Sequence, residues 1–217
     1  MGVRVKICGI TNPDDAECAA ALGADMIGLN FYERSMRYVD PAIKQWILQV
    51  LPASVTPVAL FVNEPLSYVR QRSERLNIRA VQLHGDLSEG LPASLQCIAA
   101  FTVKEAACLA RISAAVERLR SLGAAPAAVL VDAHVPGQYG GTGQVAPWHL
   151  LADFDPGAPL ILAGGLTPDN VAEAIRIVRP YAVDVASGVE SAPGKKDHEK
   201  MRRFIDAVRA SGVSRGS

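Results

Sequence analysis

The chain alternates short apolar runs with longer helix-like runs from one end to the other. Most of the apolar runs are continuous rather than alternating with polar residues, which is typical of parallel strands covered on both faces. We predict eight strands, near residues 3–8, 26–31, 57–62, 79–83, 97–101, 127–132, 159–163 and 182–186. We predict helices near residues 13–22, 41–51, 65–76, 88–95, 103–121, 146–151, 168–178 and 197–211. This alternation indicates parallel strands joined by right-handed crossovers.

Eight strand–helix units in 217 residues predict an α/β fold, a single (β/α)8 TIM barrel with eight parallel strands. An open doubly wound sheet is the alternative, although it rarely uses eight regular units. With 49% hydrophobic residues, the chain can bury one substantial core. No linker or change of composition divides it. We therefore expect one barrel domain over residues 1–210 and a frayed tail over residues 211–217.

The residues expected at the helix ends agree with this organisation. Asn12-Pro13, Asp40-Pro41 and Thr167-Pro168 each resemble an N-cap followed by proline at the first helical position. Gly23 and Gly123 follow predicted helices, where glycine readily takes a left-handed conformation.

The composition excludes several classes of function. Lys plus Arg equals Asp plus Glu at 22 each, and no basic stripe stands out, so we expect neither nucleic acid nor a membrane surface as a partner. No apolar stretch reaches about 18 residues, the length of a bilayer span. The four cysteines form neither a CxxC pair nor a zinc-spaced cluster, and their scatter suggests a reducing cytoplasm. They are Cys8, Cys18, Cys97 and Cys108.

Two chemically active side chains end predicted strands. Cys8 closes the first apolar run and is followed at once by Gly9, and Asp132 closes the sixth run in the same way. If both strands belong to one parallel sheet, the thiol and the carboxyl group lie on the same rim. One group could then remove a proton while the other delivers one. The remaining cysteines fit small buried apolar side chains.

Three glycine-rich segments follow the last three predicted strands. They are Gly140–Gly143, Ala163–Thr167 and Ala186–Glu190. Each alone fits ordinary turn chemistry, but together they predict a phosphate site, because barrels commonly bind phosphate after strands seven and eight. No Walker loop occurs, and no GxGxxG sequence follows the first strand, so a dinucleotide site has no support.

Two further residues are candidates for substrate contact. Arg37 follows the second strand, where its guanidinium could hold a carboxylate by two parallel hydrogen bonds or could simply be solvated. His84 ends the fourth strand and could contact substrate or cap the strand.

These residues lie in segments that resemble the phosphoribosylanthranilate isomerase family of tryptophan biosynthesis. The resemblance extends over residues 3–209, and its opening KICGIT and closing SGVE segments are specific in combination. The segments are Lys6–Thr11, Phe31–Val39, Leu60–Asn63, Val81–Gly85, Asp132 with Gly140–Gly143, Leu162–Leu166 with Asn170-Val171, and Asp184–Glu190.

The resemblance implies a role for each matching residue. Cys8 matches the family's general base, Asp132 its general acid, and Arg37 the arginine that binds the anthranilate carboxylate. The phosphate-binding backbone matches Gly141, Thr142, Gly143, Gly164, Gly165, Ser187 and Gly188. The chain departs from the family pattern at Ala186, where a serine is common, and at Asn30, where an aliphatic residue is usual. The resemblance implies no metal or cofactor and a monomer or homodimer.

The implied reaction is an Amadori rearrangement, in which Asp132 protonates the ribose ring oxygen and the Cys8 thiolate removes a proton from the second ribose carbon. An ordinary thiol is only a few per cent thiolate at neutral pH, so we expect phosphate-loop amides or Lys6 to assist Cys8. Asp132 must conversely hold a proton, which requires partial burial or an anionic neighbour. The alternatives are another phosphate-binding barrel isomerase or lyase of amino-acid biosynthesis, or a catalytically silent phosphate-binding barrel.

Overall fold

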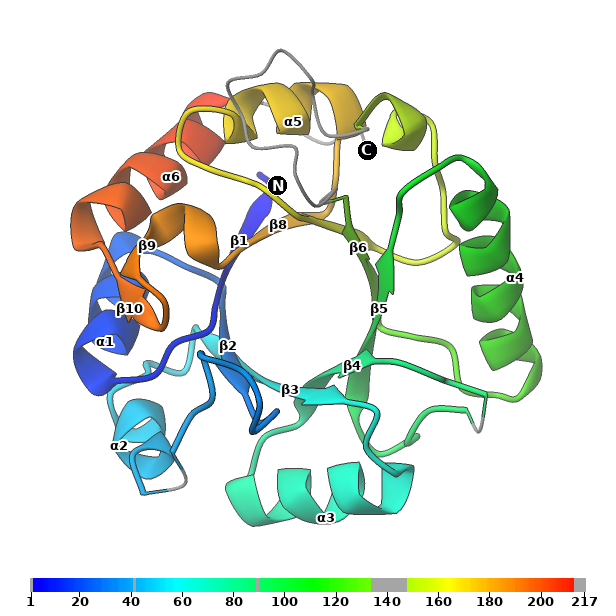
Figure 1. Cartoon of the computed structure of the whole chain (residues 1–217), viewed down its shortest axis with the longest axis horizontal. Coiled ribbons are helices and arrows are strands. Elements are labelled where there is room, and N and C mark those ends of the chain that lie inside the picture. Colours follow the sequence, from blue (N-terminus) through cyan, green and yellow to red (C-terminus); the bar gives the residue numbers. More distant parts are fainter. Residues whose placement is uncertain (1, 41, 89, 134–147, 213–217) are drawn as a thin grey trace.

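The computed structural model describes residues 2–40, 42–88, 90–133 and 148–212, which form a closed barrel of eight parallel strands (Figure 1). The strand order around the barrel follows the chain, and β8 pairs with β1 to close it. The predicted barrel is therefore confirmed. Its strands are β1 (Arg4–Cys8), β2 (Met26–Asn30), β3 (Thr56–Val62), β4 (Ala80–His84), β5 (Gln96–Thr102), β6 (Ala128–Asp132), β7 (Leu160–Ala163) and β8 (Ala182–Val185).

Helices surround the ring of strands (Figure 1). Their bounds are α1 (Pro13–Leu22), α2 (Lys44–Gln49), α3 (Leu66–Leu76), α4 (Ala107–Ser121), α5 (Val171–Val178) and α6 (His198–Ala210), with short 3₁₀ turns η1 (Trp148–Leu151) and η2 (Ser187–Val189). Among the helices in the described part of the chain, none combines the length and apolar character needed to cross a membrane.

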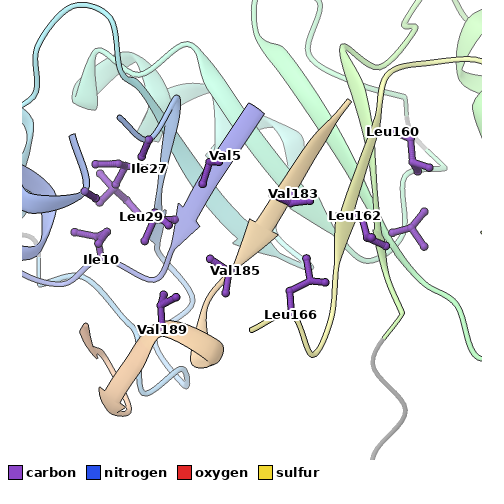
Figure 2. Packing of buried hydrophobic residues seen from close by; sticks show 14 of the residues in the cluster. Val5, Ile10, Ile27, Leu29, Leu160, Leu162, Leu166, Val183, Val185 and Val189 are labelled. Atoms are coloured by element: carbon purple, nitrogen blue, oxygen red, sulfur yellow. The ribbon is translucent and has the colours of Figure 1, made fainter. Parts of the chain in front are cut away.

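Side chains divide into two apolar clusters because successive strand residues point to opposite faces. The smaller cluster fills the barrel interior and includes Met26, Val58 and Ile98. The larger cluster lies between the strands and the surrounding helices (Figure 2). Val5 of β1 and Val183 of β8 belong to this outer cluster and are fully or almost fully buried. Both faces of the strands are thus covered, which explains their continuous apolar sequence.

Several predicted helix ends are confirmed. The Asn12 side chain accepts a hydrogen bond from the Asp15 amide at 2.8 Å, as an N-cap does. Gly23 (φ 91°) and Gly123 (φ 72°) take left-handed conformations after α1 and α4. At Asp40-Pro41, position 41 lies outside the described residues, and α2 begins only at Lys44.

Other helix predictions are wrong in extent or type. The expected helix over residues 88–95 is absent from 88 and 90–95, because Gly90 is left-handed (φ 96°) and Pro92 restricts the residue before it. The helix expected from Pro168 begins at Val171, since the Asn170 side chain accepts a hydrogen bond from the Thr167 amide and completes a turn first. Residues 148–151 of the expected helix 146–151 form the 3₁₀ turn η1.

A small antiparallel hairpin after β8 is missing from the sequence-based prediction. It consists of β9 (Glu190–Ala192) and β10 (Lys195–Lys196). The buried Asp15 carboxylate accepts the Lys196 amide at 2.9 Å and also lies 2.8 Å from His198 Nε2. These contacts fasten the hairpin and the start of α6 to the start of α1, beside the carboxyl end of β1 (Figure 1).

Candidate active site

Cys8 is the last residue of β1 and lies at the carboxyl end of the barrel with 7% of its surface exposed. Lys6 is two residues earlier on the same strand, so its side chain points into the barrel with Cys8. Lys6 is fully buried and its Nζ lies 2.8 Å from Oδ1 of Asp184 on β8. Gly28 of β2 is the register partner of Cys8 and borders both side chains.

Asp132 ends β6 at the same rim as Cys8 and is half-buried. Only β7 and β8 separate β6 from β1 around the closed ring (Figure 1). Asp132 shares the strand face of Ala128 and Leu130, which belong to the interior cluster, so its carboxyl group is directed toward the barrel mouth. The structure therefore brings the predicted acid and base to one opening.

His84 ends β4 on the interior side of the barrel, where its Nε2 lies 2.7 Å from Nε2 of the buried Gln82. Burial lowers the pKa of His84 below the ordinary value of 6.5, and the positive charge of Lys6 lowers it further. His84 is therefore neutral at physiological pH and can exchange hydrogen bonds with a sugar. Asp132 acts electrostatically on the same imidazole, so the two side chains share the mouth.

Arg37 is held in the mouth by a partner that the sequence prediction missed. Its Nε and Nη2 donate to the two carboxylate oxygens of Glu190 at 2.8 and 2.7 Å. Hydrogen bonding to Glu190 raises the pKa of Arg37, so the guanidinium stays charged. Glu190 occupies one edge of the guanidinium, and its three remaining N–H groups are available to a carboxylate on the substrate.

The loop that carries Arg37 is folded by Asn30. The Asn30 side chain donates to Ser35 Oγ at 3.0 Å and accepts from the Tyr32 amide at 2.9 Å, while Ser35 Oγ accepts from the Arg37 amide. This polar residue at the end of β2 thus shapes the loop. Gly9, next to Cys8, leaves room for the Arg37 stem, since a Cβ there would lie 2.6 Å from Arg37 Cδ.

Glu190 also pairs with Lys196 of the hairpin, whose Nζ lies 2.9 Å from Glu190 Oε1. Burial alone would raise the pKa of Glu190, but hydrogen bonds from Arg37 and Lys196 bring it below the ordinary 4.5. Burial lowers the pKa of Lys196, and Glu190 opposes this change. This network could not be predicted from the sequence, because Arg37 and Glu190 are 153 positions apart.

Lys6 assists Cys8 as the sequence predicts, but burial outweighs this assistance. Burial raises the pKa of Cys8 above its ordinary 9.0, and the charges of Lys6 and Lys196 offset only part of this rise. For Lys6, burial would lower the pKa, but Asp184 and Cys8 together raise it above 10.5. Lys6 therefore remains a cation beside the sulfur, and in the free protein most of Cys8 is a thiol at neutral pH.

Two of the three predicted glycine loops lie together on the rim. After β7, Gly164 and Gly165 are left-handed (φ 92° and 65°), and Gly165 is exposed. After β8, Ser187 is exposed, and Gly188 lies so close to the Leu166 carbonyl that any Cβ would collide with it. The two loops thus form one glycine-lined surface. Gly141, Thr142 and Gly143 of the third loop lie outside the described residues.

A family model for N-(5'-phosphoribosyl)anthranilate isomerase matches residues 5–207 of the chain. The chain belongs to this isomerase family. An N-(5'-phosphoribosyl)anthranilate isomerase of Geobacter metallireducens is 46% identical over 210 residues, which cover 96% of this chain and 100% of the relative. A relative of the same name from Acidithiobacillus ferrooxidans is 46% identical over 211 residues, covering 96% of this chain and 98% of its own length.

Solved structures of this isomerase family share the fold. Phosphoribosyl anthranilate isomerase from Thermotoga maritima has a TM-score of 0.84 and 38% sequence identity, over 96% of this chain and 99% of that chain. Another structure of the isomerase was solved in complex with reduced 1-(o-carboxyphenylamino)-1-deoxyribulose 5-phosphate. It has a TM-score of 0.81 and 36% identity over the same shares of the two chains.

Proposed function

We propose that this isomerase converts N-(5-phosphoribosyl)anthranilate to 1-(2-carboxyphenylamino)-1-deoxyribulose 5-phosphate in tryptophan biosynthesis, with Cys8 as general base and Asp132 as general acid. The observation that carries the assignment is the position of both residues at the carboxyl ends of β1 and β6, on one rim of a closed barrel. Catalytic residues of barrel enzymes lie at this face. Family membership supports the reaction itself.

The reaction needs one proton donor and one proton acceptor around a sugar. Asp132 gives its proton to the furanose ring oxygen, so the bond from this oxygen to the first ribose carbon breaks while the nitrogen lone pair forms a protonated imine. The Cys8 thiolate then takes the proton from the second ribose carbon, and the electrons of that bond form an enolamine. The enolamine tautomerises to the ketone. The sequence is redox-neutral, and each proton transfer can contribute about 10²- to 10⁴-fold.

The substrate carries an anionic group at each end, and the protein can hold it by both. The phosphate is placed at the glycine-lined surface of Gly164, Gly165, Ser187 and Gly188, and the anthranilate carboxylate at the free edge of Arg37. Held at both ends, the ribose lies between the acid and the base. Fixing a reactant in this way reduces the entropic part of the barrier.

The test is an assay that follows the loss of substrate fluorescence. We expect Cys8→Ser and Asp132→Asn each to lower kcat at least a hundredfold, since each removes a proton-transfer group, while thermal unfolding changes little. Cys18→Ser, on helix α1 outside the mouth, is the matched control and should keep full turnover. Near-full turnover by Cys8→Ala would contradict the assignment of the base.

We also propose a cytoplasmic location and a monomer or homodimer. The Thermotoga maritima relative is described as dimeric and has also been solved as monomers. Light scattering coupled to size-exclusion chromatography at micromolar concentration would distinguish the two states, and a larger assembly would contradict the proposal.

A further inference from the structure

Lys6 is a fully buried cation placed next to the proposed base. A buried ammonium group is costly unless it is paired, and Lys6 is paired by Asp184 at 2.8 Å across the β1–β8 junction. The partner is itself buried at 8% exposure. The pair lies inside the barrel, where apolar side chains of similar size would fill the space at least as well. Its position therefore calls for a role other than stability.

The neighbouring strand β2 is shaped to admit this cation. Gly28 of β2 has no side chain, and a Cβ there would lie 2.7 Å from Cys8 Sγ and 3.1 Å from Lys6 Nζ. A real Cβ essentially never approaches a neighbour as closely as the first of these distances. The bare backbone of Gly28 thus leaves room for both the ammonium group and the sulfur.

Charged groups reach Cys8 from several elements. Lys6 lies on its own strand, Asp184 on β8 and Lys196 on β10, and Arg37 acts on it from the β2–α2 loop. His84 on β4, which is neutral, faces the Lys6–Asp184 pair from across the interior. Of these groups, Lys6 has the largest effect on the ionisation of the sulfur.

We propose that Lys6, anchored by Asp184 and admitted by Gly28, is the positioning residue that stabilises the thiolate of Cys8. The inference rests on the proposed role of Cys8 as the base. The thiol proton passes to solvent at the barrel mouth, and the negative charge left on sulfur is neutralised by the Lys6 ammonium group. The thiolate then takes the proton from the second ribose carbon and becomes a thiol again. Lys6 keeps all three of its protons throughout, and Asp184 keeps Lys6 directed at the sulfur.

The test measures the thiolate directly, without the isomerase substrate. Alkylation of Cys8 by iodoacetamide is followed against pH by mass spectrometry of the Cys8 peptide. Lys6→Met removes a charge that ordinarily changes a neighbouring pKa by about 1–3, so the alkylation midpoint should rise by that amount. Asp184→Asn removes an opposing charge and should lower the midpoint. Lys6→Met/Asp184→Asn leaves no unpaired buried charge and should give a midpoint between those of wild type and Lys6→Met.

The ascending order Asp184→Asn, wild type, double variant, Lys6→Met supports the proposal. Since Lys6→Met alone strands a buried carboxylate and can fail to fold, the double variant decides. A midpoint for the double variant equal to or below that of wild type overturns the proposal. Lys195→Met, which removes an exposed lysine on β10, is the matched control and should leave the midpoint unchanged.

Kinetics separate positioning from a merely structural role. In the double variant the alkaline limb of the kcat profile should move with the alkylation midpoint. At pH 7, kcat should fall about tenfold each time this midpoint rises by about one pH unit, while KM changes less than about threefold.

Gly28→Ala keeps every charge but displaces the sulfur from the ammonium group, and it should raise the alkylation midpoint too. If the four proteins show the predicted order of alkylation midpoints but the wild type shows no turnover, the proposed function alone is refuted. Full turnover in every variant, with an unchanged midpoint, would refute the role of Lys6 alone.

Discussion

Replacing Glu190 by Gln should destabilise the barrel and loosen its mouth at the same time. The side chain keeps its size and one acceptor oxygen, but the charge shared by Arg37 and Lys196 is lost. The carboxylate is 5% exposed, Lys196 is 0% exposed and Arg37 is 25% exposed, so solvent screens the network little. Breaking a buried pair by removing one partner costs about 3–5 kcal/mol. We expect about 3 kcal/mol for Glu190→Gln, because the amide retains a hydrogen bond.

The pH dependence of this loss follows from the lowered pKa of Glu190. A carboxyl group whose pKa is lower in the folded protein stabilises the fold fully above its ordinary pKa, here 4.5. This contribution disappears as pH falls through the lower, folded value. The difference between wild type and Glu190→Gln should therefore be constant from about pH 6 to 8 and shrink below about pH 4.5.

Urea unfolding followed by circular dichroism at about pH 7 and about pH 3.5 measures both quantities, and thermal melting should show a decrease in Tm of about 6–12 °C at pH 7. The same variant should raise KM, because Arg37 loses the partner that orients its free edge. Glu199→Gln is the matched control, since this carboxylate is 70% exposed and faces Arg202 at 3.5 Å. Equal stability of Glu190→Gln and wild type at neutral pH, or a difference that persists unchanged at the acidic pH, would refute the reasoning.

Two further substitutions test the anchoring of the substrate. Arg37→Ala removes charge-assisted hydrogen bonds, and since the loss of even one costs about 1.5–3 kcal/mol, KM should rise at least about 10- to 100-fold in steady-state kinetics. The pH profile of kcat should change little, and an unchanged KM would exclude the carboxylate contact. Gly188→Ala would drive a Cβ into the Leu166 carbonyl and separate the two glycine loops, so inorganic phosphate should inhibit the variant more weakly than it inhibits wild type. Equal inhibition of both proteins would place the phosphate elsewhere.

The eight strands were predictable because each is buried on both faces and so reads as a continuous apolar run. That same continuity hides which residues point inward, since it removes the alternation that would mark the two faces. Lys6 interrupts the apolar run of β1. It lies two positions before Cys8 and therefore on the same face of the strand, but the sequence alone does not show whether that face points into the barrel. The helix ends were less predictable. The turn completed by Asn170 and the left-handed Gly90 each overrode a plausible helical sequence.

The contacts that build the site were not predictable, because they join distant parts of the chain. Asp184 meets Lys6 across 178 positions, and Lys196 meets Asp15 across 181. Only the closed ring, which brings β8 beside β1, creates these pairs. Type and position made Arg37 a candidate carboxylate ligand, but its partner Glu190 depends on the short hairpin that follows β8. The candidate residues and Lys6 could thus be named from the sequence, whereas the ion pairs with Asp184 and Glu190 could not.

The balance of charge around Cys8 explains how a buried thiol can serve as a base. Lys6, Lys196 and Arg37 supply three positive charges, while Asp184 and Glu190 supply two negative ones. Ionisation of the sulfur neutralises this surplus positive charge. Burial opposes that ionisation and keeps the pKa of Cys8 high, which also makes the thiolate a stronger base once it forms. The site thus combines a small thiolate population with high proton affinity, and it needs the Lys6 charge to keep that population from vanishing.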